Sequence, residues 1–125
     1  MNGKRNGKGK EYDYFNGNIR FEGEYLNGER NGKGKEYKWN ILIFEGEYIK
    51  GERNGKGKEY NYFEQLKFEG EYLNGERNGT GKGYYDGRLI FEGEYLFNRK
   101  YNGRGYDKNG NLIYEIRKGT GKVKS

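Results

Sequence analysis

Glutamates spaced two residues apart are the one arrangement in this sequence that could support acid–base chemistry. They form four pairs: Glu22/Glu24, Glu45/Glu47, Glu69/Glu71 and Glu92/Glu94. Alternate residues on one face of a strand lie roughly 7 Å apart, which is within the carboxylate separation that glycosidases use. However, four equivalent copies with lysines such as Lys33 and Lys56 nearby are typical of a solvated charge ladder. We favour the ladder.

Other candidate catalytic, metal-binding and cofactor-binding residues are lacking. The sequence has no histidine and no cysteine, so no nucleophile or base completes a site around the glutamates, and no cysteine-based metal site exists. Gly32-Lys33-Gly34 lacks the Ser or Thr and the helix that complete a phosphate-binding loop. We expect its glycines, which have no side chain, to allow an aromatic ring to pack directly against the backbone. We predict a protein that is not an enzyme, with no cofactor, metal or small-molecule substrate.

Positive charge is concentrated at both ends of the chain. The net charge is +6, whereas segment 13–95 is net acidic. Basic residues between tyrosines are typical of nucleic-acid binding, but the acidic middle argues against that partner. Four bases near the C-terminus would each add about 1 kcal/mol at an anionic lipid surface, or would protect an exposed edge strand from aggregation; we favour the second. They are Arg117, Lys118, Lys122 and Lys124.

A repeated stretch must position all of these residues. Residues 21–37 return with few changes at 44–60 and 68–84, and a looser copy begins at Phe91. The low hydrophobic content, 30%, would by itself suggest disorder, but aromatic residues recur beside glycines at a fixed period of about 23 residues, which indicates a repeat architecture. We predict one domain, 1–125. Its units are a half unit 3–20, full units 21–43, 44–67, 68–90 and 91–111, and a degenerate unit 112–125.

Each unit is predicted to be a β-hairpin. Its apolar residues alternate with polar ones, which is the period of a strand, and Asn27-Gly28 is a strong signal for a two-residue turn. That turn would place Phe21 opposite Gly34 and Gly23 opposite Gly32. Tyr37 would then fall on the polar face unless a bulge follows Gly34, and we expect such a bulge. About eleven strands would stack side by side, because one hairpin cannot bury its aromatic face alone.

The spacing of aromatic residues and glycines closely resembles the MORN repeat. Three units carry the pattern aromatic-x-Gly-x-Tyr-x-x-Gly-x-x-x-Gly-x-Gly, with Phe in the usual leading Tyr place. The resemblance implies an elongated antiparallel meander of stacked hairpins that is lined by aromatics. It also implies a scaffold, a self-associating module or an adaptor for peptides or membranes. The glycines that we expect to be structural are Gly23, Gly28, Gly32, Gly34, Gly46, Gly51, Gly55, Gly57, Gly70, Gly75, Gly79 and Gly81.

The connections after the first two full units contain apolar residues where a polar loop is expected. They are Trp39, the run 41–44, Tyr62, Phe63 and Leu66. These residues either pack across neighbouring hairpins or form a patch for a partner. We favour packing, because an apolar loop of one unit would cover the ring of the next.

We therefore predict an all-β rod that acts as a scaffold or adaptor through a protein partner or through itself. An aromatic-lined groove would hold a peptide or helix, and its docking residues would be Phe21, Tyr25, Phe44, Tyr48, Phe68, Tyr72, Phe91 and Tyr95. The edge strands, 8–15 and 119–124, would form a homodimer. The alternative is a module that binds anionic phospholipid through its basic ends. No apolar run reaches the roughly 20 residues of a membrane span, and we expect a cytoplasmic location.

Overall fold

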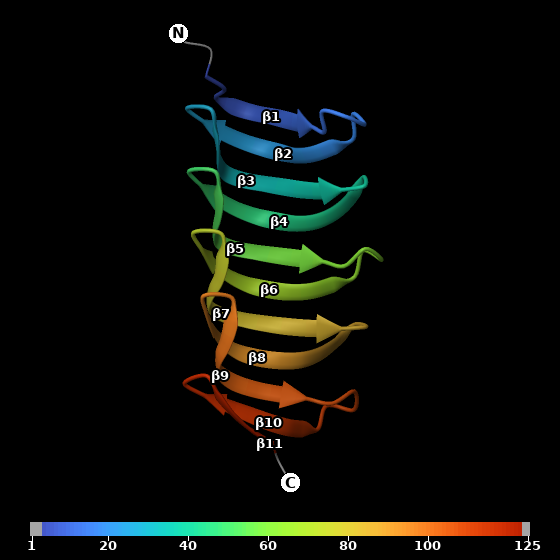
Figure 1. Ribbon diagram of the computed structural model, residues 1–125, viewed down its shortest axis with the longest axis vertical. Coiled ribbons are helices and arrows are strands. Elements are labelled where there is room, and N and C mark those ends of the chain that lie inside the picture. Colours follow the sequence, from blue (N-terminus) through green and yellow to red (C-terminus); the bar gives the residue numbers. More distant parts are fainter. Residues whose placement is uncertain (1–3, 124–125) are drawn as a thin grey trace.

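The chain forms a single open antiparallel sheet of eleven strands that pair in sequence order (Figure 1). This computed structural model describes residues 4–123, and no helix occurs among them. The predicted all-β meander is confirmed. The strands are β1 (Gly7–Tyr12), β2 (Ile19–Leu26), β3 (Glu29–Lys38), β4 (Ile41–Ile49), β5 (Glu52–Tyr60), β6 (Leu66–Leu73), β7 (Glu76–Tyr85), β8 (Arg88–Leu96), β9 (Arg99–Tyr106), β10 (Leu112–Arg117) and β11 (Thr120–Val123).

The two long edges of the rod are built from different loops (Figure 1). The two-residue turns from β2 to β3, β4 to β5, β6 to β7, β8 to β9 and β10 to β11 lie along one edge, here called the tip edge. The remaining loops lie along the opposite edge, here called the connection edge. Asn27 and Gly28 have φ angles of 52° and 85°, as a type I′ turn requires. The predicted hairpin turn is therefore confirmed.

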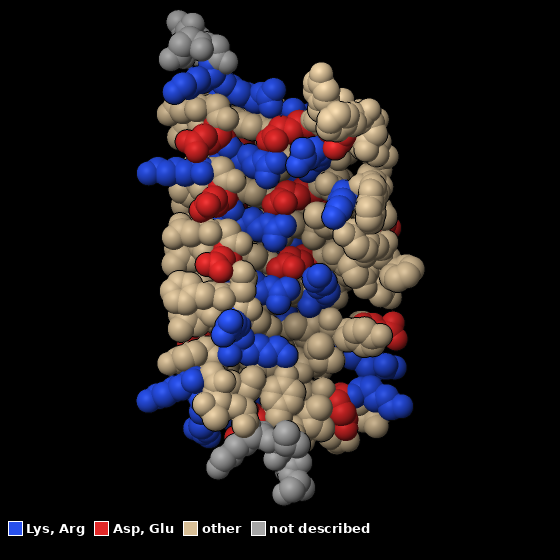
Figure 2. Space-filling view, in the orientation of Figure 1, with Lys and Arg blue, Asp and Glu red and all other residues tan. Residues whose placement is uncertain are grey.

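One face of the sheet is charged. Backbone pairing places Glu22 between Lys10 and Lys35, and Glu45 between Lys35 and Lys58. The alternation continues along the rod, so that Lys and Arg alternate with Asp and Glu down the middle of the molecule (Figure 2). We call this surface the charged face. It is the ladder expected from the glutamate pairs, in which Glu22 and Glu45 lie between lysines on both neighbouring strands, whereas Glu94 lies between Thr80 and Asn102.

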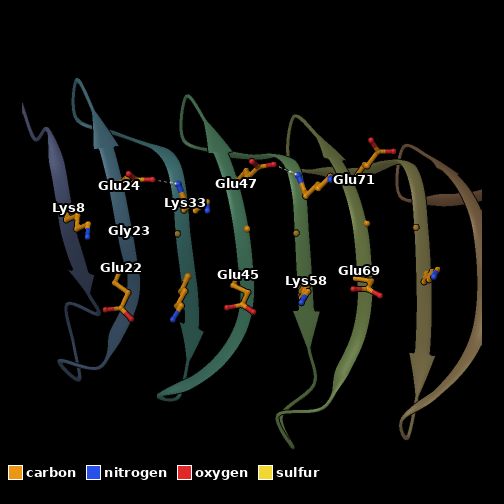
Figure 3. Close-up of a pocket in the computed structure, with 18 of the residues that line it drawn as sticks. Lys8, Glu22, Gly23, Glu24, Lys33, Glu45, Glu47, Lys58, Glu69 and Glu71 are labelled. Carbon is orange, nitrogen blue, oxygen red and sulfur yellow. Dashed lines mark hydrogen bonds between the residues drawn. The ribbon is translucent and has the colours of Figure 1, made fainter.

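The hairpin register differs from the predicted one. Tyr25 pairs with Arg30, but Gly23 pairs with Gly34, so Glu24 alone faces the three residues 31–33. The backbone amide of Lys33 donates a hydrogen bond of 2.6 Å to the Glu24 carboxylate, which holds this wide bulge in place (Figure 3). Glu47 and Glu71 bind the amides of Lys56 and Thr80 in the same way.

Because of each bulge, the first Phe of a unit pairs with a residue two positions later than predicted. Phe21 pairs with Glu36, so the predicted pairing with Gly34 is wrong. A second irregularity lies where β3 pairs with β4, because Ile43 is an extra residue between the partners of Glu36 and Tyr37. The prediction of a bulge after Gly34 that moves Tyr37 off the polar face is therefore wrong, because the extra residue lies in β4. Tyr37 stays on the charged face, where its hydroxyl donates a 2.6 Å hydrogen bond to Glu22.

The other face of the sheet buries a continuous file of rings, here called the aromatic column. In the first three full units each Phe lies edge-on between the Tyr of its own unit and the Tyr of the next. Phe44, for example, has its ring centroid 5.8 Å from that of Tyr48 and 5.1 Å from that of Tyr72, with interplanar angles of 86°. Phe91 lies edge-on to Tyr95 and stacks on Tyr114. T-shaped pairs at such distances are stabilised by about 0.5–1.5 kcal/mol beyond their buried area. This column is the hydrophobic core.

A row of glycines leaves room for the rings. Gly23, Gly34, Gly46, Gly57 and Gly70 pair with one another from strand to strand, and the row extends from β1 to β9. A Cβ atom on Gly34 would collide with the Phe21 ring. Glycine is therefore required here by the close approach of a ring to the backbone. The row ends in β10, where Ile116 faces Gly103 and packs against the core.

Replacing Gly57 by alanine should lower the free energy of unfolding by about 3 kcal/mol, as overpacking of a tight core does. The new Cβ would lie 2.5 Å from Cζ of Phe44 and 3.0 Å from Cε1 of Tyr72. Urea unfolding followed by fluorescence measures the change. Gly83→Ala is the matched control, because its Cβ would meet no atom closer than 3.6 Å, and it should change stability by less than about 0.5 kcal/mol. Equal losses in both variants would contradict the packing argument.

Candidate functional site

The eight rings predicted to line a docking groove form the aromatic column instead. Phe21, Tyr25, Phe44, Tyr48, Phe68, Tyr72, Phe91 and Tyr95 are only 0–7% exposed. Beyond the bulge each hairpin tip covers the ring of its own unit, and the guanidinium of Arg30 lies 4.2 Å from the Phe21 centroid. These rings offer no surface to a partner in this structure.

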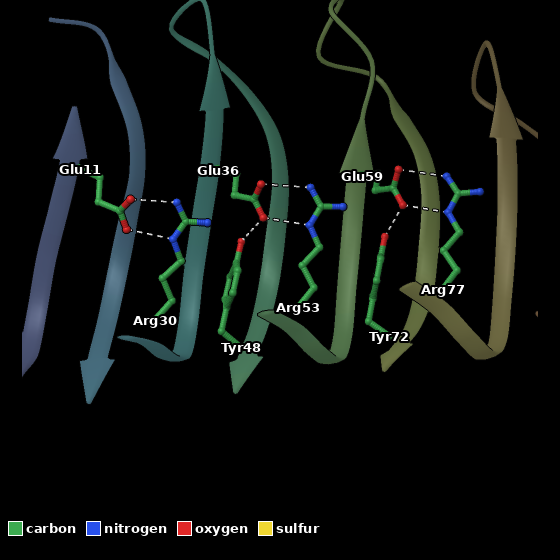
Figure 4. A network of polar contacts seen from close by, with 8 residues as sticks. All are labelled: Glu11, Arg30, Glu36, Tyr48, Arg53, Glu59, Tyr72 and Arg77. Atoms are coloured by element: carbon green, nitrogen blue, oxygen red, sulfur yellow. Dashed lines mark hydrogen bonds and ion pairs between the residues drawn. The ribbon is translucent and has the colours of Figure 1, made fainter. Parts of the chain in front are cut away.

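Carboxylates of one unit bind the next unit through a network of hydrogen bonds and ion pairs (Figure 4). Glu36 accepts two hydrogen bonds from the Arg53 guanidinium, at 2.8 and 3.1 Å, and one of 2.5 Å from the Tyr48 hydroxyl. Such bidentate, charge-assisted bonds are the strong ones. The same set recurs twice, as Glu11 with Tyr25 and Arg30, and as Glu59 with Tyr72 and Arg77. We call these three sets the inter-unit network.

The inter-unit network shifts the acidity of its members. Burial alone would raise the pKa of Glu36, but the hydrogen bonds and charge of Arg53 outweigh it and hold that pKa below its usual range. Glu59 is affected in the same way by Arg77. Burial and the hydrogen bond to Glu36 raise the pKa of Tyr48 far above its usual range. Each site therefore holds an ionised carboxylate beside a neutral phenol and a cation across the neutral pH range.

Asparagine side chains join each hairpin tip to the tip of the next unit by hydrogen bonds. The side-chain oxygen of Asn54 accepts a bond from the Asn74 amide at 3.2 Å, and that of Asn78 accepts one from the Phe97 amide at 3.1 Å. The sequence interpretation missed these asparagines and the arginines of the inter-unit network. The signal was present, because Glu-Arg-Asn-Gly stands at residues 29–32, 52–55 and 76–79, but it reads as an ordinary polar segment after a turn.

The charged face forms a shallow groove about 1400 Å³ in volume, with glycines as its floor and glutamates and lysines as its walls (Figure 3). The glutamate pairs lie here. In each of the first three pairs one member, Glu24, Glu47 or Glu71, accepts the backbone amide that holds a bulge. That carboxylate has a structural role, and the equivalent sites repeat along the groove with no distinct cleft. This arrangement suits a solvated ladder better than an acid–base pair.

The connection edge exposes aromatic side chains. Trp39 is 64% exposed and Phe63 85% exposed, and the Trp39 ring lies 5.3 Å from that of Tyr62. The expectation that these connection residues pack across the hairpins is therefore right only in part for Trp39 and Tyr62, whose rings contact each other across two successive connections but stay exposed, and it is wrong for Phe63. It is right for Phe44, which is buried, and in part for Leu66, which is half-buried. Tyr14 and Phe15 add a further exposed pair on the same edge.

The basic C-terminal end is described only in part. The side chain of Arg117 is 86% exposed and lies 3.8 Å from the Glu115 carboxylate. Lys118 is exposed in the turn between β10 and β11. The Lys122 backbone belongs to β11 and pairs with Glu115. The side chain of Lys122, and the whole of Lys124, lie outside the described residues.

The fold and its surfaces define a repeat rod built from stacked hairpins. The family model described as MORN repeat matches residues 1–18, 21–38, 44–61 and 68–87. The chain belongs to the MORN-repeat family. MORN repeats generally take part in protein or membrane interactions, and the family is a non-catalytic repeat module. A comparison with curated proteins finds no match.

Two further findings concern the described residues alone. Between residues 4 and 123, no helix is long and apolar enough to cross a membrane. In the same range, no group of three or more acidic, cysteine or histidine residues is arranged to hold a metal ion.

Because of the inter-unit network, the free energy of unfolding should decrease at acid pH. The folded-state pKa of Glu36 and of Glu59 lies below the ordinary value of 4.5, so the unfolded chain binds protons first as pH falls. Their contribution is fully present above about pH 4.5 and is lost as pH falls through the folded-state pKa. Urea unfolding should give a lower free energy at about pH 3 than at pH 6.

The matched variants for this prediction are Glu36→Gln and Glu29→Gln. Glu36→Gln should lose about 2 kcal/mol at pH 6, because it leaves Arg53 without its charged partner, and its stability should fall less steeply with acid. Glu29 is exposed at the tip edge, so Glu29→Gln should keep the wild-type profile. Parallel profiles for wild type and Glu36→Gln would show that the network does not govern the acid transition.

Proposed function

We propose that this chain is a non-enzymatic scaffold or adaptor that binds another protein along its connection edge. The observation that supports the proposal most directly is the row of exposed aromatics on that edge, of which Trp39, Tyr62 and Phe63 form the middle part. Aromatic residues are enriched at protein interfaces and among the residues that contribute most binding energy. Membership of the MORN-repeat family supports an interaction role.

The architecture suits a scaffold. Every strand pairs only with its neighbours in sequence, and both the aromatic column and the inter-unit network cross every boundary between the full units up to β7. A rod of this kind presents equivalent surfaces at intervals of two strands, about 10 Å. A partner that repeats its own contacts at this spacing can engage several units at once.

Self-association is a second route to the same role. Within residues 4–123 the outer edges of β1 and β11 have no strand paired to them, and open edges of this kind can pair with another copy. The predicted homodimer through 8–15 and 119–124 therefore stays a proposal, with the strand portions Gly7–Tyr12 and Thr120–Val123 as its contact surfaces. A cytoplasmic location likewise stays a proposal.

Binding to an anionic membrane surface is the alternative function. The observation that favours it is the exposed pair Arg117 and Lys118 at the C-terminal end of the rod. Surface attraction of this kind falls within a Debye length and weakens with salt. Flotation with phosphatidylserine vesicles should then show binding that is lost in Arg117→Gln/Lys118→Gln and at 0.5 M salt. Binding that survives both changes would count against the basic end.

The protein-binding proposal predicts that Trp39→Ser/Phe63→Ser abolishes capture of partner proteins by the immobilised chain. Both side chains are exposed, so stability should change by less than about 0.5 kcal/mol per site. Ile49→Ser/Leu73→Ser is the matched control, because it removes two exposed apolar side chains from the opposite, tip edge. Mass spectrometry of the captured proteins provides the readout.

Equal capture by wild type and Trp39→Ser/Phe63→Ser would refute the connection edge as the docking surface. Equal loss in both double variants would point to nonspecific adhesion. Absolute mass measured in a dilution series separates the two routes, because a concentration-dependent dimer indicates self-association and a constant monomer indicates a foreign partner.

A further inference from the structure

The carboxylate of the inter-unit network is missing at the boundary between β7 and β8. Glu36 pairs with Phe44 and Glu59 pairs with Phe68, and both bind the Tyr and Arg of the next unit. The residue that pairs with Phe91 in the same register is Gly83. The side chains that would receive its carboxylate are still present, as Tyr95 and Lys100. One boundary of the rod therefore has the cationic and hydroxyl groups of the network without its acid.

The space for the missing carboxylate is open. A Cβ on Gly83 would meet the Tyr95 hydroxyl at 3.6 Å, Phe91 at 3.8 Å and Ile90 at 3.9 Å, all ordinary contact distances. The equivalent position one unit further on is Gly105, where the Tyr114 ring occupies the space that a side chain would need. The vacancy is thus confined to Gly83, which is half-buried and can be reached from solvent.

The Tyr95 hydroxyl lacks the partner that its counterparts have. The hydroxyls of Tyr48 and Tyr72 donate to Glu36 and Glu59, whereas within residues 4–123 that of Tyr95 has no carboxylate to bind. Tyr95 as a whole is 4% exposed. In the described part of the chain, every side-chain oxygen or nitrogen that is fully buried has a hydrogen-bond partner. The Tyr95 hydroxyl has none there, so it must be in contact with solvent. Burial is the main cause of its raised pKa, and the neutral phenol is a hydrogen-bond donor.

Lys100 supplies the positive charge. Its ammonium lies 4.7 Å from the Phe91 centroid, close to where Arg53 and Arg77 lie over Phe44 and Phe68. It donates a 2.9 Å hydrogen bond to the Tyr114 hydroxyl. An ammonium has three donors, so two remain for an incoming acceptor. Glu36 and Glu59 neutralise Arg53 and Arg77, but no carboxylate of residues 4–123 forms an ion pair with Lys100. This cation therefore favours an anion from another molecule.

We propose that Gly83, Tyr95 and Lys100 form a carboxylate-binding site that accepts an acid from another molecule. Its occupant is an Asp or Glu side chain of a protein partner, or a free small carboxylate of the same chemistry. The bound group occupies the place that Glu36 and Glu59 take at the other boundaries, with the Tyr95 hydroxyl and the Lys100 ammonium as its donors. The inference rests on the proposed function only where the occupant is a side chain of a protein partner.

The test is an NMR titration of the ¹⁵N-labelled full chain with sodium acetate, against sodium chloride at equal ionic strength. The amide signals of Gly83 and Tyr95 should shift and saturate in the millimolar range, as expected for a few charge-assisted hydrogen bonds. Tyr95→Phe and Lys100→Met should each weaken binding about tenfold, a loss of one such bond. Tyr72→Phe is the matched control, since its site is filled by Glu59, and it should bind acetate as wild type does.

Gly83→Glu supplies the acid internally and gives an independent readout. It should abolish the acetate-dependent shifts and raise the thermal midpoint by about 4 °C, because the new carboxylate would bind Tyr95 and Lys100. Unchanged acetate binding in Gly83→Glu, or no shift at Gly83 beyond the chloride control, would overturn the proposal. A folded spectrum for each variant ensures that a loss of binding is not a loss of structure.

A capped peptide with a single glutamate distinguishes the two sources of the acid. Shifts at Gly83 with both peptide and acetate assign the site to protein carboxylates, and shifts with acetate alone assign it to small free ones. Trp39→Ser/Phe63→Ser should leave both titrations unchanged. Failure of the connection edge as a docking surface is therefore distinguishable from failure of this site.

Discussion

The structure depends on one constraint: a single-layered sheet must bury rings without a second layer to cover them. The solution places each Phe on bare glycine backbone, covers it with a cation of its own hairpin tip (Arg in three units, Lys100 in the fourth), and fills its sides with two tyrosines. One of those tyrosines belongs to the next unit. A unit therefore completes its core only when its neighbour is in place, which is the nearest-neighbour coupling expected of repeat proteins.

Polar contacts reinforce the same coupling. Glu36 reaches forward to Tyr48 and Arg53, and the tip asparagines also bind the following unit. Because Arg53 both covers Phe44 and binds Glu36, the apolar and the polar contacts share one side chain. Charge-assisted bonds of this kind fix a single register, since a slip of one residue would leave a half-buried carboxylate without its partner. At the boundary with Gly83 the carboxylate is absent, and Tyr95 and Lys100 are the hydrogen-bond donors that the proposed site uses.

The sequence was sufficient for the architecture but not for the role of each side chain. Period-two patterning and Asn27-Gly28 predict the strands and turns, because both depend on local backbone preference. The wide bulge opposite Glu24 was not predictable, because it rests on a bond from a side chain to the Lys33 amide that forms only after pairing. That bulge brings Arg30 over Phe21, which is why rings expected in an open groove are buried. The sequence pattern did not indicate the site at Gly83, because this residue looks like one more glycine among many.

The pairing of strands only with their neighbours also determines how the chain folds. Its strand-to-strand contacts join segments that follow one another in sequence, so closing each new contact costs little loop entropy. Low contact order of this kind favours fast folding. Each strand can pair as soon as its predecessor is in place. The rod can therefore grow unit by unit from its N-terminal end during synthesis, with no distant segment needed to complete it.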